Sequence, residues 1–199
     1  MAENAHPTPS PSDILDRAIL FATEAHRGAF RKGTRIPYIL HPLEAAAIAA
    51  TITTDYEVLS AAVLHDVLED TAVTEAELRE VFGSRVAELV CAESENKRAE
   101  LPAGDTWRIR KQETLDALRE EDRRDVKILV LADKLSNVRA IHRDFRALGD
   151  ALWERFNMKD KDQIGWYYRS IAEALEAELG ETLAWQEYRG LVEGTFGGA

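Results

Sequence analysis

The sequence predicts an all-α fold, built as a single helical bundle. Apolar residues recur at spacings of three and four along most of the chain, which is the period of an amphipathic helix. No segment alternates polar and apolar residues as a half-buried strand would, and no internal repeat is present. With 199 residues, 45% of them hydrophobic, the chain is long enough for one substantial core and too short for two ordinary domains with a linker.

Glycines and prolines divide the first part of the chain. Residues 1–11 are rich in Pro, Ser and Ala, and we expect a disordered tail there. Ser12 is placed to cap a first helix that ends at about His26. Residues 27–37 hold two glycines, a proline and four basic residues, which predicts a basic loop. A second helix begins near Pro42 and continues through the apolar residues that follow.

Capping residues and apolar periodicity place the remaining helices. Asp55 can cap a third helix that ends in the stretch 61–70, and Thr74 with Glu77 forms a capping box. Further helices are expected over residues 74–83, 84–91, 106–115, 125–145, 163–179 and 183–192. The interval 94–105 contains a proline and a glycine and is expected to be a loop. The predicted domain covers residues 12–193, and residues 194–199 are expected to form a flexible tail.

Composition limits the function classes. The formal net charge of −11 argues against nonspecific binding to nucleic acid or to an anionic membrane surface, since both select a basic face. An anionic ligand would therefore need a local basic patch or a metal ion. The one cysteine, Cys91, excludes an internal disulfide and suits a reducing compartment. Because no secretory signal or apolar membrane span is recognisable, we expect a cytoplasmic protein.

The stretch 61–70 ends an apolar run with four ionisable side chains. In a continuous helix Glu69 lies one turn beyond His65 and Asp66, and Asp70 lies one turn beyond Asp66, so one face can carry all four. An imidazole and three carboxylates beside buried aliphatic side chains are costly to desolvate unless a cation neutralises them. A divalent metal ion is the commonest such cation.

Four residues on three expected helices can supply metal ligands: His41, His65, Asp66 and Asp133. Two imidazoles and two carboxylates suit a hard or borderline divalent ion, and the choice among manganese, iron, zinc and magnesium stays open. Two alternatives also stay open. Asp133 could pair with Lys134, and His41 could simply pack against the start of its helix.

The chain carries a series of short motifs in this order: His26-Arg27-Gly28, Arg31-Lys32-Gly33, Pro37-Tyr38-Ile39 with His41-Pro42, Leu64-His65-Asp66 with Glu69-Asp70-Thr71, and Ala132-Asp133-Lys134 with Asn137. Together they resemble the HD superfamily of metal-dependent phosphohydrolases, and within it the alarmone hydrolase domain of RelA/SpoT-type enzymes. The likeness extends from about residue 14 to residue 137. It implies a single HD-domain helical bundle.

The resemblance implies removal of the 3′-pyrophosphate from guanosine tetra- or pentaphosphate. It also implies one manganese ion (Mn²⁺) held by the four ligand candidates named above, and it assigns catalysis to Glu69 and Asp70. The residues expected to hold the phosphorylated nucleotide are Arg27, Arg31, Lys32, Tyr38, Lys134 and Asn137.

The chain is similar further to the free-standing small alarmone hydrolases, and we expect no synthesis of the alarmone. The segment 95–107 departs from the long enzymes of the family, and substrate identity is therefore open. One alternative is an HD phosphohydrolase for another phosphorylated nucleotide, such as an adenine alarmone or NADPH with its 2′-phosphate. Another is a nucleotide sensor without turnover. A homodimer also stays open.

Overall fold

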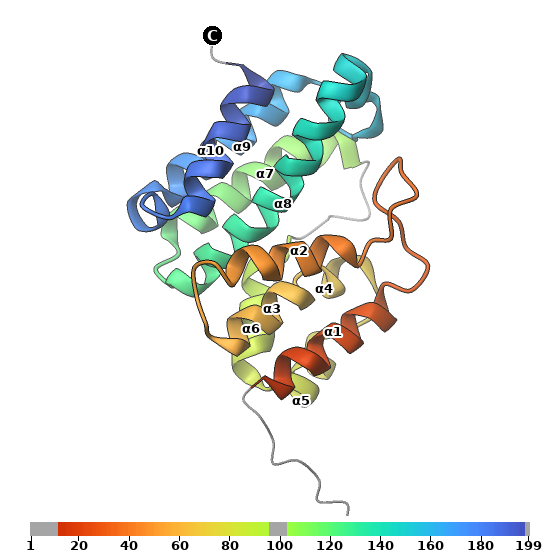
Figure 1. Cartoon of the computed structure of the whole chain (residues 1–199), viewed down its shortest axis with the longest axis vertical. Helices are drawn as coiled ribbons and strands as arrows, with labels where there is room; N and C mark the ends of the chain where they lie inside the picture. Colours follow the sequence, from red (N-terminus) through yellow and green to blue (C-terminus); the bar gives the residue numbers. More distant parts are fainter. Residues whose placement is uncertain (1–11, 96–102, 198–199) are drawn as a thin grey trace, which may run out of the picture.

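The computed structural model describes residues 12–95 and 103–197, and over these ranges it confirms the all-α fold (Figure 1). The helices are α1 (Asp13–Ala25), α2 (Leu40–Ala49), α3 (Tyr56–Leu64), α4 (Val67–Asp70), α5 (Glu75–Phe82), α6 (Ser84–Glu93), α7 (Ala103–Glu120), α8 (Arg124–Leu148), the 3-10 helix η1 (Gly149–Arg155), α9 (Lys161–Leu179) and α10 (Leu183–Phe196). The described residues contain one isolated antiparallel bridge, between Phe30 and Pro37, and no strand. None of the described helices is long and apolar enough to cross a membrane.

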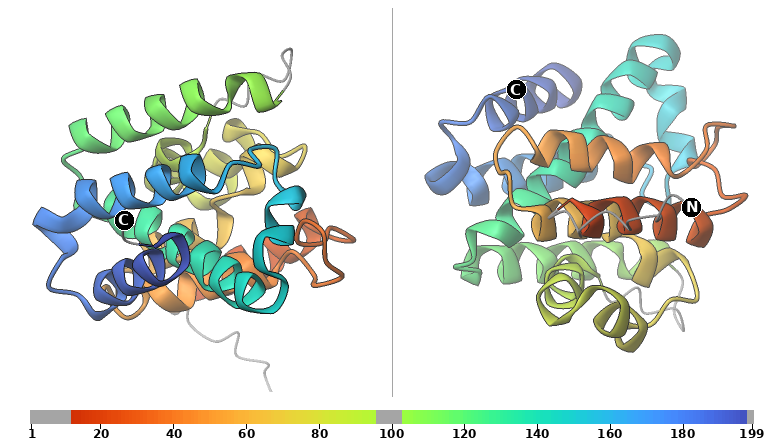
Figure 2. Two further views of the ribbon diagram at one scale, coloured as in Figure 1. Left: turned by 90° about the horizontal axis from the view of Figure 1, so that it is seen from above. Right: turned by 60° about the horizontal axis from the view of Figure 1, so that its bottom comes forward.

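Helix α8 is the centre of the bundle, as its broad apolar side predicts. It packs against α2, α3, α6, α9 and α10, and its fully buried side chains include Leu131, Leu135 and Val138. Figure 1 shows α1 to α6 in the lower half of the molecule and α7 to α10 in the upper half, with α8 reaching down to α2. Figure 2 shows the same meeting of α2 and α8 from two other sides. Polar side chains on these two helices can therefore face one another at the junction.

Local sequence signals explain several helix ends. The Asp55 carboxylate accepts a hydrogen bond from the backbone N–H of Glu57 at the start of α3. Thr74 and Glu77 exchange both hydrogen bonds of a capping box at the start of α5. Both predicted caps are confirmed.

The start of α7 differs from the prediction. The helix begins at Ala103, so the expected loop over residues 94–105 ends earlier than proposed. Thr106 lies inside the helix and does not cap it. Its hydroxyl is buried and accepts a hydrogen bond from Arg110 Nε at 3.1 Å, one turn further on. Residues 96–102 lie outside the described ranges.

The C-terminal boundary also differs. Helix α10 continues to Phe196, so the predicted tail of residues 194–199 is wrong for residues 194–196. Thr195 and Phe196 are buried, and the Phe196 ring packs against the rings of Trp153 and Tyr168. These contacts keep the last turn helical. The 3-10 helix η1, which carries Trp153, was not predicted, and the predicted N-terminal tail lies outside the described ranges.

The sequence predicted one continuous helix over the stretch 61–70, and this prediction is wrong. Helix α3 ends at Leu64 and α4 begins at Val67, with His65 and Asp66 in the turn between them. The His65 ring explains the interruption, because its Nδ1 lies 2.9 Å from the carbonyl oxygen of Ala62. That carbonyl would bond to the backbone N–H of Asp66 in an uninterrupted helix. The interruption lets two consecutive side chains turn toward the same point.

Candidate metal centre and active site

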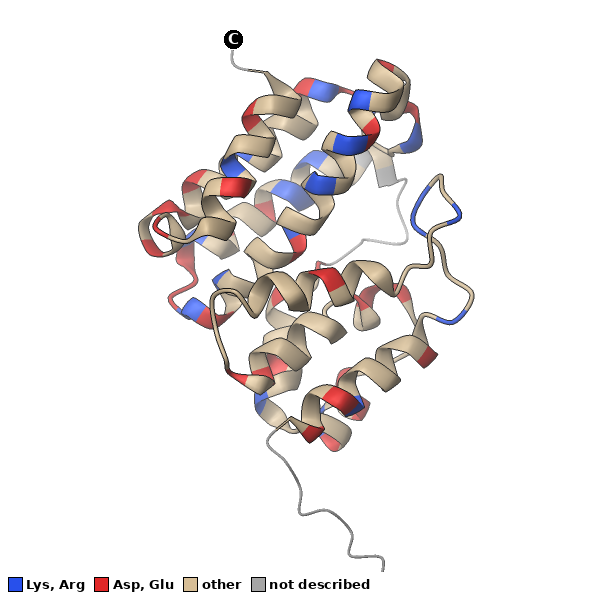
Figure 3. Ribbon diagram, in the orientation of Figure 1, with Lys and Arg blue, Asp and Glu red and all other residues tan. Residues whose placement is uncertain are grey.

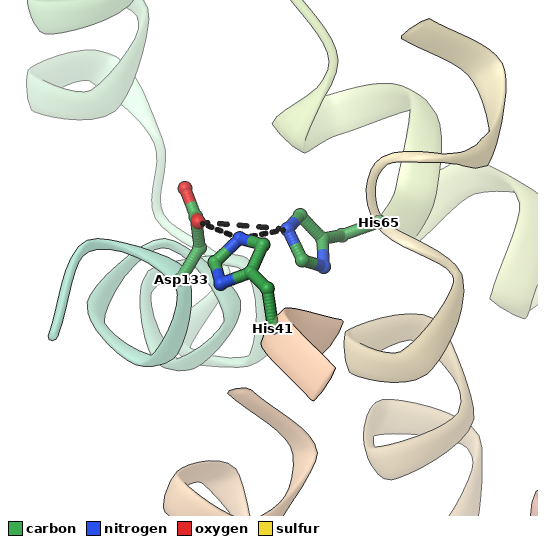
Figure 4. Close-up of side chains that lie close together, drawn as sticks. All are labelled: His41, His65 and Asp133. Atoms are coloured by element: carbon green, nitrogen blue, oxygen red, sulfur yellow. Dashed lines mark hydrogen bonds and ion pairs between the residues drawn. The ribbon is translucent and has the colours of Figure 1, made fainter. Parts of the chain in front are cut away.

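Atoms that can bind a metal ion converge from three parts of the bundle. A ring nitrogen of His41 on α2, a ring nitrogen of His65 after α3 and a carboxylate oxygen of Asp133 on α8 lie within 4.8 Å of one another (Figure 4). His41 Nε2 is 2.9 Å from Asp133 Oδ1 and 3.3 Å from His65 Nε2. All three residues are buried.

Asp66 adds a fourth donor to this cluster. Its Oδ2 lies 2.9 Å from His65 Nε2 and 3.5 Å from His41 Nε2. The Tyr38 hydroxyl donates a hydrogen bond of 2.7 Å to the same carboxylate oxygen. Burial and the charge of Asp66 raise the pKa of Tyr38 well above its usual value, so this hydroxyl stays a donor. Tyr38 thereby holds Asp66 toward the two imidazoles.

The donor set fits a divalent metal ion. Two imidazole nitrogens and two carboxylate oxygens are ligands that borderline divalent ions accept. Burial alone lowers the pKa of His65, but the carboxylates of Asp66 and Asp133 outweigh it and raise that pKa well above its usual value. At His41 burial outweighs the same carboxylates and lowers the pKa, so added positive charge is favoured at His65. The pairing of Asp133 with Lys134 coexists with this arrangement, since Oδ2 contacts Lys134 while Oδ1 faces the imidazoles.

The basic loop 27–37 folds back on itself beside the cluster. Its backbone closes through a hydrogen bond from Arg31 N to Ile36 O, 2.9 Å long. Gly33 has φ of +70°, and a Cβ there would lie 2.8 Å from the side chain of Arg155 on η1. The loop therefore needs glycine at this point for both its conformation and its close approach to η1. This packing holds Arg31 at the site, where its guanidinium donates to Asn137 Oδ1 at 2.7 Å.

A small cavity of about 200 Å³ opens beside the cluster. Its basic lining residues are Arg31, Arg110, Lys111 and Lys134, and its acidic lining residues beyond the metal cluster are Glu69, Glu93 and Glu95. Figure 3 shows basic positions on the loop after α1 and on the upper helices, whereas acidic positions predominate on the lower ones. A chain of net charge −11 thus brings four cationic side chains to a cavity that is also lined by the metal-binding residues.

A larger cavity of about 620 Å³ adjoins the small one, since Arg31, Tyr38, His41 and Asn137 line both. Much of its wall is apolar and comes from the following residues: Ile36, Leu40, Ala140, Ile141, Leu152 and Phe156. A cavity of this size and character is suited to a flat, partly apolar group that is joined to charged groups in the small cavity.

The predicted catalytic carboxylates lie at different distances from the small cavity. Glu69 lines it, and its Oε1 accepts a 2.7 Å hydrogen bond from the backbone N–H of Glu95. Asp70 is exposed and is not among the residues that line either cavity. Its carboxylate lies close enough to Tyr38 to contribute to the raised pKa of that hydroxyl. The geometry therefore favours Glu69 for direct contact with a bound molecule.

Most of the residues predicted to bind substrate gather around the cluster. Asn137 Nδ2 donates to Asp133 Oδ1 at 2.6 Å, and Lys134 Nζ lies 3.2 Å from Glu93 Oε1. Lys32 lines the larger cavity and donates to Asn157 Oδ1 at 3.0 Å.

Arg27 is the predicted substrate residue that the fold leaves apart. Its side chain is exposed and forms an ion pair with Glu24. It lines neither of the two cavities.

Sequence reasoning missed the contribution of α7. Arg110 and Lys111 line the small cavity, and both contact Glu95, whose Oε2 is 2.5 Å from Lys111 Nζ. The available signal was a group of basic residues at Arg108, Arg110 and Lys111, the second such group in an acidic chain. Its proximity to the cluster depends on how α7 packs against α9, which spacing along the sequence does not reveal.

The helical bundle with its buried centre of two histidines and two aspartates defines a class of metal-binding domain. A family model described as "HD domain" matches residues 18–156, and the chain belongs to this family. This confirms the resemblance seen in the sequence. The match contains all four candidate metal ligands and ends before α9.

Named relatives agree with this assignment. The chain is 38% identical over 133 residues to a guanosine-3′,5′-bis(diphosphate) 3′-pyrophosphohydrolase of Aquifex aeolicus, which covers 67% of this chain and 18% of the relative. The chain spans less than a fifth of the length of this relative and of two other curated relatives that it matches.

Two solved structures share the fold. The structure of lmo0812 from Listeria monocytogenes EGD-e matches with 32% identity and a TM-score of 0.68, over 78% of this chain and 98% of that one. The structure reported as a metazoan ortholog of SpoT that hydrolyzes ppGpp matches with 23% identity and a TM-score of 0.72, over 94% of this chain and 97% of that one. The second match extends the shared fold to nearly the whole chain.

Proposed function

We propose that this chain is a Mn²⁺-dependent hydrolase that removes the 3′-pyrophosphate of guanosine tetra- or pentaphosphate. The observation that carries the proposal is the position of the four-donor metal cluster at the wall of a cavity lined by four cationic side chains. A metal ion beside a cationic pocket is the arrangement that phosphoryl transfer requires. The name of the Aquifex relative, which shares this region, supplies the choice of nucleotide.

His41, His65, Asp66 and Asp133 would hold the metal ion. When bound there, the ion would act as a Lewis acid. It would also lower the pKa of a bound water molecule, so that a nucleophile is available at neutral pH. Two nitrogen and two oxygen donors are compatible with Mn²⁺, which we propose as the metal on the strength of the resemblance. Metal analysis of the protein after expression without added metal tests this choice, and zinc or iron in stoichiometric amount would contradict it.

The other side chains that line the cavities would have separate roles in the proposed reaction. In the proposed reaction, water adds to the phosphorus attached to the ribose 3′ oxygen, the bond between these two atoms breaks, and the 3′ oxygen takes up a proton. Glu69, which lines the small cavity, would orient the water and accept its proton. Arg110, Lys111 and Lys134 would bind the pyrophosphate as charge-assisted donors, while the larger cavity holds the nucleoside.

Incubation of the metal-loaded protein with guanosine tetraphosphate tests the proposal, with GDP and pyrophosphate as the expected products. A parallel panel contains an adenine alarmone and NADPH. Faster release of phosphate from NADPH, or faster cleavage of the adenine compound, would replace the proposed substrate. Tight binding of guanosine tetraphosphate without product would identify a sensor and overturn the proposed activity.

A further inference from the structure

The metal-facing imidazole of His41 is bonded on its other side to Ser136 and, through it, to Glu44. Both side chains line the larger cavity, and the proposed reaction assigns no chemical step to them. His41 Nδ1 lies 2.8 Å from Ser136 Oγ on α8, and Ser136 Oγ lies 2.7 Å from Glu44 Oε2 on α2. His41 and Ser136 are 4% and 1% exposed, so water does not compete for the bond between them.

The direction of these hydrogen bonds follows from the chemistry of the groups. A carboxylate only accepts, so the single proton of the Ser136 hydroxyl is donated to Glu44. Ser136 Oγ can then only accept from His41, which places the ring proton on Nδ1. The lone pair of His41 Nε2 is thereby directed toward Asp133 and His65, where the metal would bind.

Glu44 is itself held in place from a third helix. Its Oε1 lies 3.1 Å from Arg139 Nη1, and Arg139 forms two further bonds of 2.7 Å to the carboxylate of Glu187 on α10. Glu187 lies beyond residue 156, where the match to the HD-domain family ends. The connection to the metal cluster therefore begins in a part of the chain that the family match does not cover.

We propose that Ser136 and Glu44 are positioning residues that fix the tautomer of His41, so that Nε2 is available to the metal ion. The proposal rests on the metal site of the proposed function and not on the identity of the substrate. The two imidazoles differ in the group that accepts the hydrogen bond from Nδ1. His65 Nδ1 bonds to the backbone carbonyl of Ala62, which no side-chain substitution removes, whereas His41 depends on two replaceable side chains.

The test compares Glu44→Ala with Glu44→Gln in the full chain. Alanine removes the acceptor, which frees the Ser136 hydroxyl to donate to His41 Nδ1. The His41 ring proton can then move to Nε2, where Asp133 Oδ1 at 2.9 Å accepts it. Glutamine keeps an acceptor oxygen for Ser136 and is the matched control. Because the Glu44 side chain is 40% exposed, both variants are expected to fold.

Nitrogen-15 NMR of the imidazole rings in the metal-free protein reports the tautomers directly. We expect the Nδ1–H form of His41 in the wild type and in Glu44→Gln, and a shift toward Nε2–H in Glu44→Ala, with His65 unchanged in all three. Titration with MnCl₂ by calorimetry should show affinity reduced by about 10-fold to 100-fold in Glu44→Ala alone. Ser136→Ala should give a loss of the same order.

Retention of the Nδ1–H form and of wild-type Mn²⁺ affinity in Glu44→Ala would overturn the proposal. An equal loss in Glu44→Gln would also overturn it, since the negative charge and not the hydrogen-bond direction would then be responsible. These measurements need no substrate. A tautomer shift in a protein that does not cleave guanosine tetraphosphate would support the positioning role and reject the proposed function separately.

Discussion

The two walls of the candidate active site are built in different ways. On the metal wall, two imidazoles and two carboxylates face one another and are held by Tyr38, Ser136 and the backbone of Ala62. Lys134 contacts only the outer oxygen of Asp133. On the basic wall, three of the four cations already have an acidic partner, and Arg31 donates to the amide oxygen of Asn137. Glu95 contacts both Arg110 and Lys111, and Glu93 contacts Lys134.

This difference indicates how each wall meets its ligand. The donor atoms of the metal wall already converge, so the proposed metal ion would bind with little rearrangement. In the proposed reaction, the basic wall would exchange an internal carboxylate for the phosphate of the substrate. Lys111 shows why such a partner is needed, since burial and the neighbouring charge of Lys134 lower its pKa while Glu95 opposes the change. Substitutions on the two walls should therefore separate metal binding from substrate binding.

The largest effect is expected for Asp66→Ala on the metal wall. The substitution removes the oxygen that lies 2.9 Å from His65 Nε2 and also the acceptor of the Tyr38 hydroxyl. We expect loss of Mn²⁺ binding in calorimetry and loss of all metal-dependent turnover. Asp125→Ala, which removes a surface carboxylate paired with Arg85, is the control and should bind Mn²⁺ as the wild type does. Wild-type Mn²⁺ affinity in Asp66→Ala would remove Asp66 from the ligand set.

Glu69→Gln should retain the metal and lose the reaction. Glutamine keeps an oxygen for the backbone N–H of Glu95 but no longer takes up a proton at neutral pH. We expect kcat to fall by about 100-fold or more, with Mn²⁺ affinity unchanged. Steady-state kinetics with guanosine tetraphosphate and calorimetry on the same preparation provide the two readouts. Full turnover in this variant would show that another group handles the proton.

Lys111→Ala on the basic wall should weaken the binding of substrate and leave the metal in place. A buried charge-assisted hydrogen bond contributes about 1.5–3 kcal/mol, so KM should rise by about 10-fold to 100-fold. Lys159→Ala is the matched control, because Lys159 is exposed and paired with Glu154 on the surface. A lower Mn²⁺ affinity with unchanged KM would assign Lys111 to the metal wall and contradict the division between the two walls.

Glu95→Gln should act in the opposite direction. The variant keeps the backbone N–H that bonds to Glu69 but weakens the hold of Glu95 on Arg110 and Lys111. If the carboxylate competes with phosphate, inorganic pyrophosphate should bind several-fold more tightly, by about 3-fold to 10-fold. Calorimetric titration with pyrophosphate measures this, and thermal unfolding measures the stability lost with the ion pairs. Weaker pyrophosphate binding would indicate that Glu95 orients the two cations and does not compete with phosphate.

The same division explains what could be predicted from the sequence. His41, His65, Asp66 and Asp133 stand in short ordered motifs, and the fold brings them together as expected. The interruption of the helix at His65 was missed because it depends on a side chain that donates a hydrogen bond to a backbone carbonyl of the preceding turn. Such a bond leaves no mark in helical periodicity.

The basic wall was only partly predicted for a different physical reason. Its cations come from a loop, from α7 and from α8, and only tertiary packing decides which of the many basic residues of the chain face the cavity. Arg31 and Lys134 were predicted through their motifs, whereas Arg110 and Lys111 were not. Burial in a low-dielectric wall distinguishes these cations from those on the surface, and that property is not local in sequence.

Arg27 gives the smallest expected effect and the sharpest test of that distinction. It stands in a family-like motif next to His26, yet its side chain is exposed and paired with Glu24. Arg31, four residues on, lines both cavities and donates to Asn137. We expect Arg27→Ala to change KM by less than about 2-fold, since an exposed, solvated charge contributes little, whereas Arg31→Ala should raise KM by about 10-fold or more. Steady-state kinetics on both variants, at the same Mn²⁺ concentration, measures the contrast. An equal rise of KM in both variants would mean that the loop moves Arg27 into the site when substrate binds. The basic wall would then include more of the loop than the residues that line the cavities.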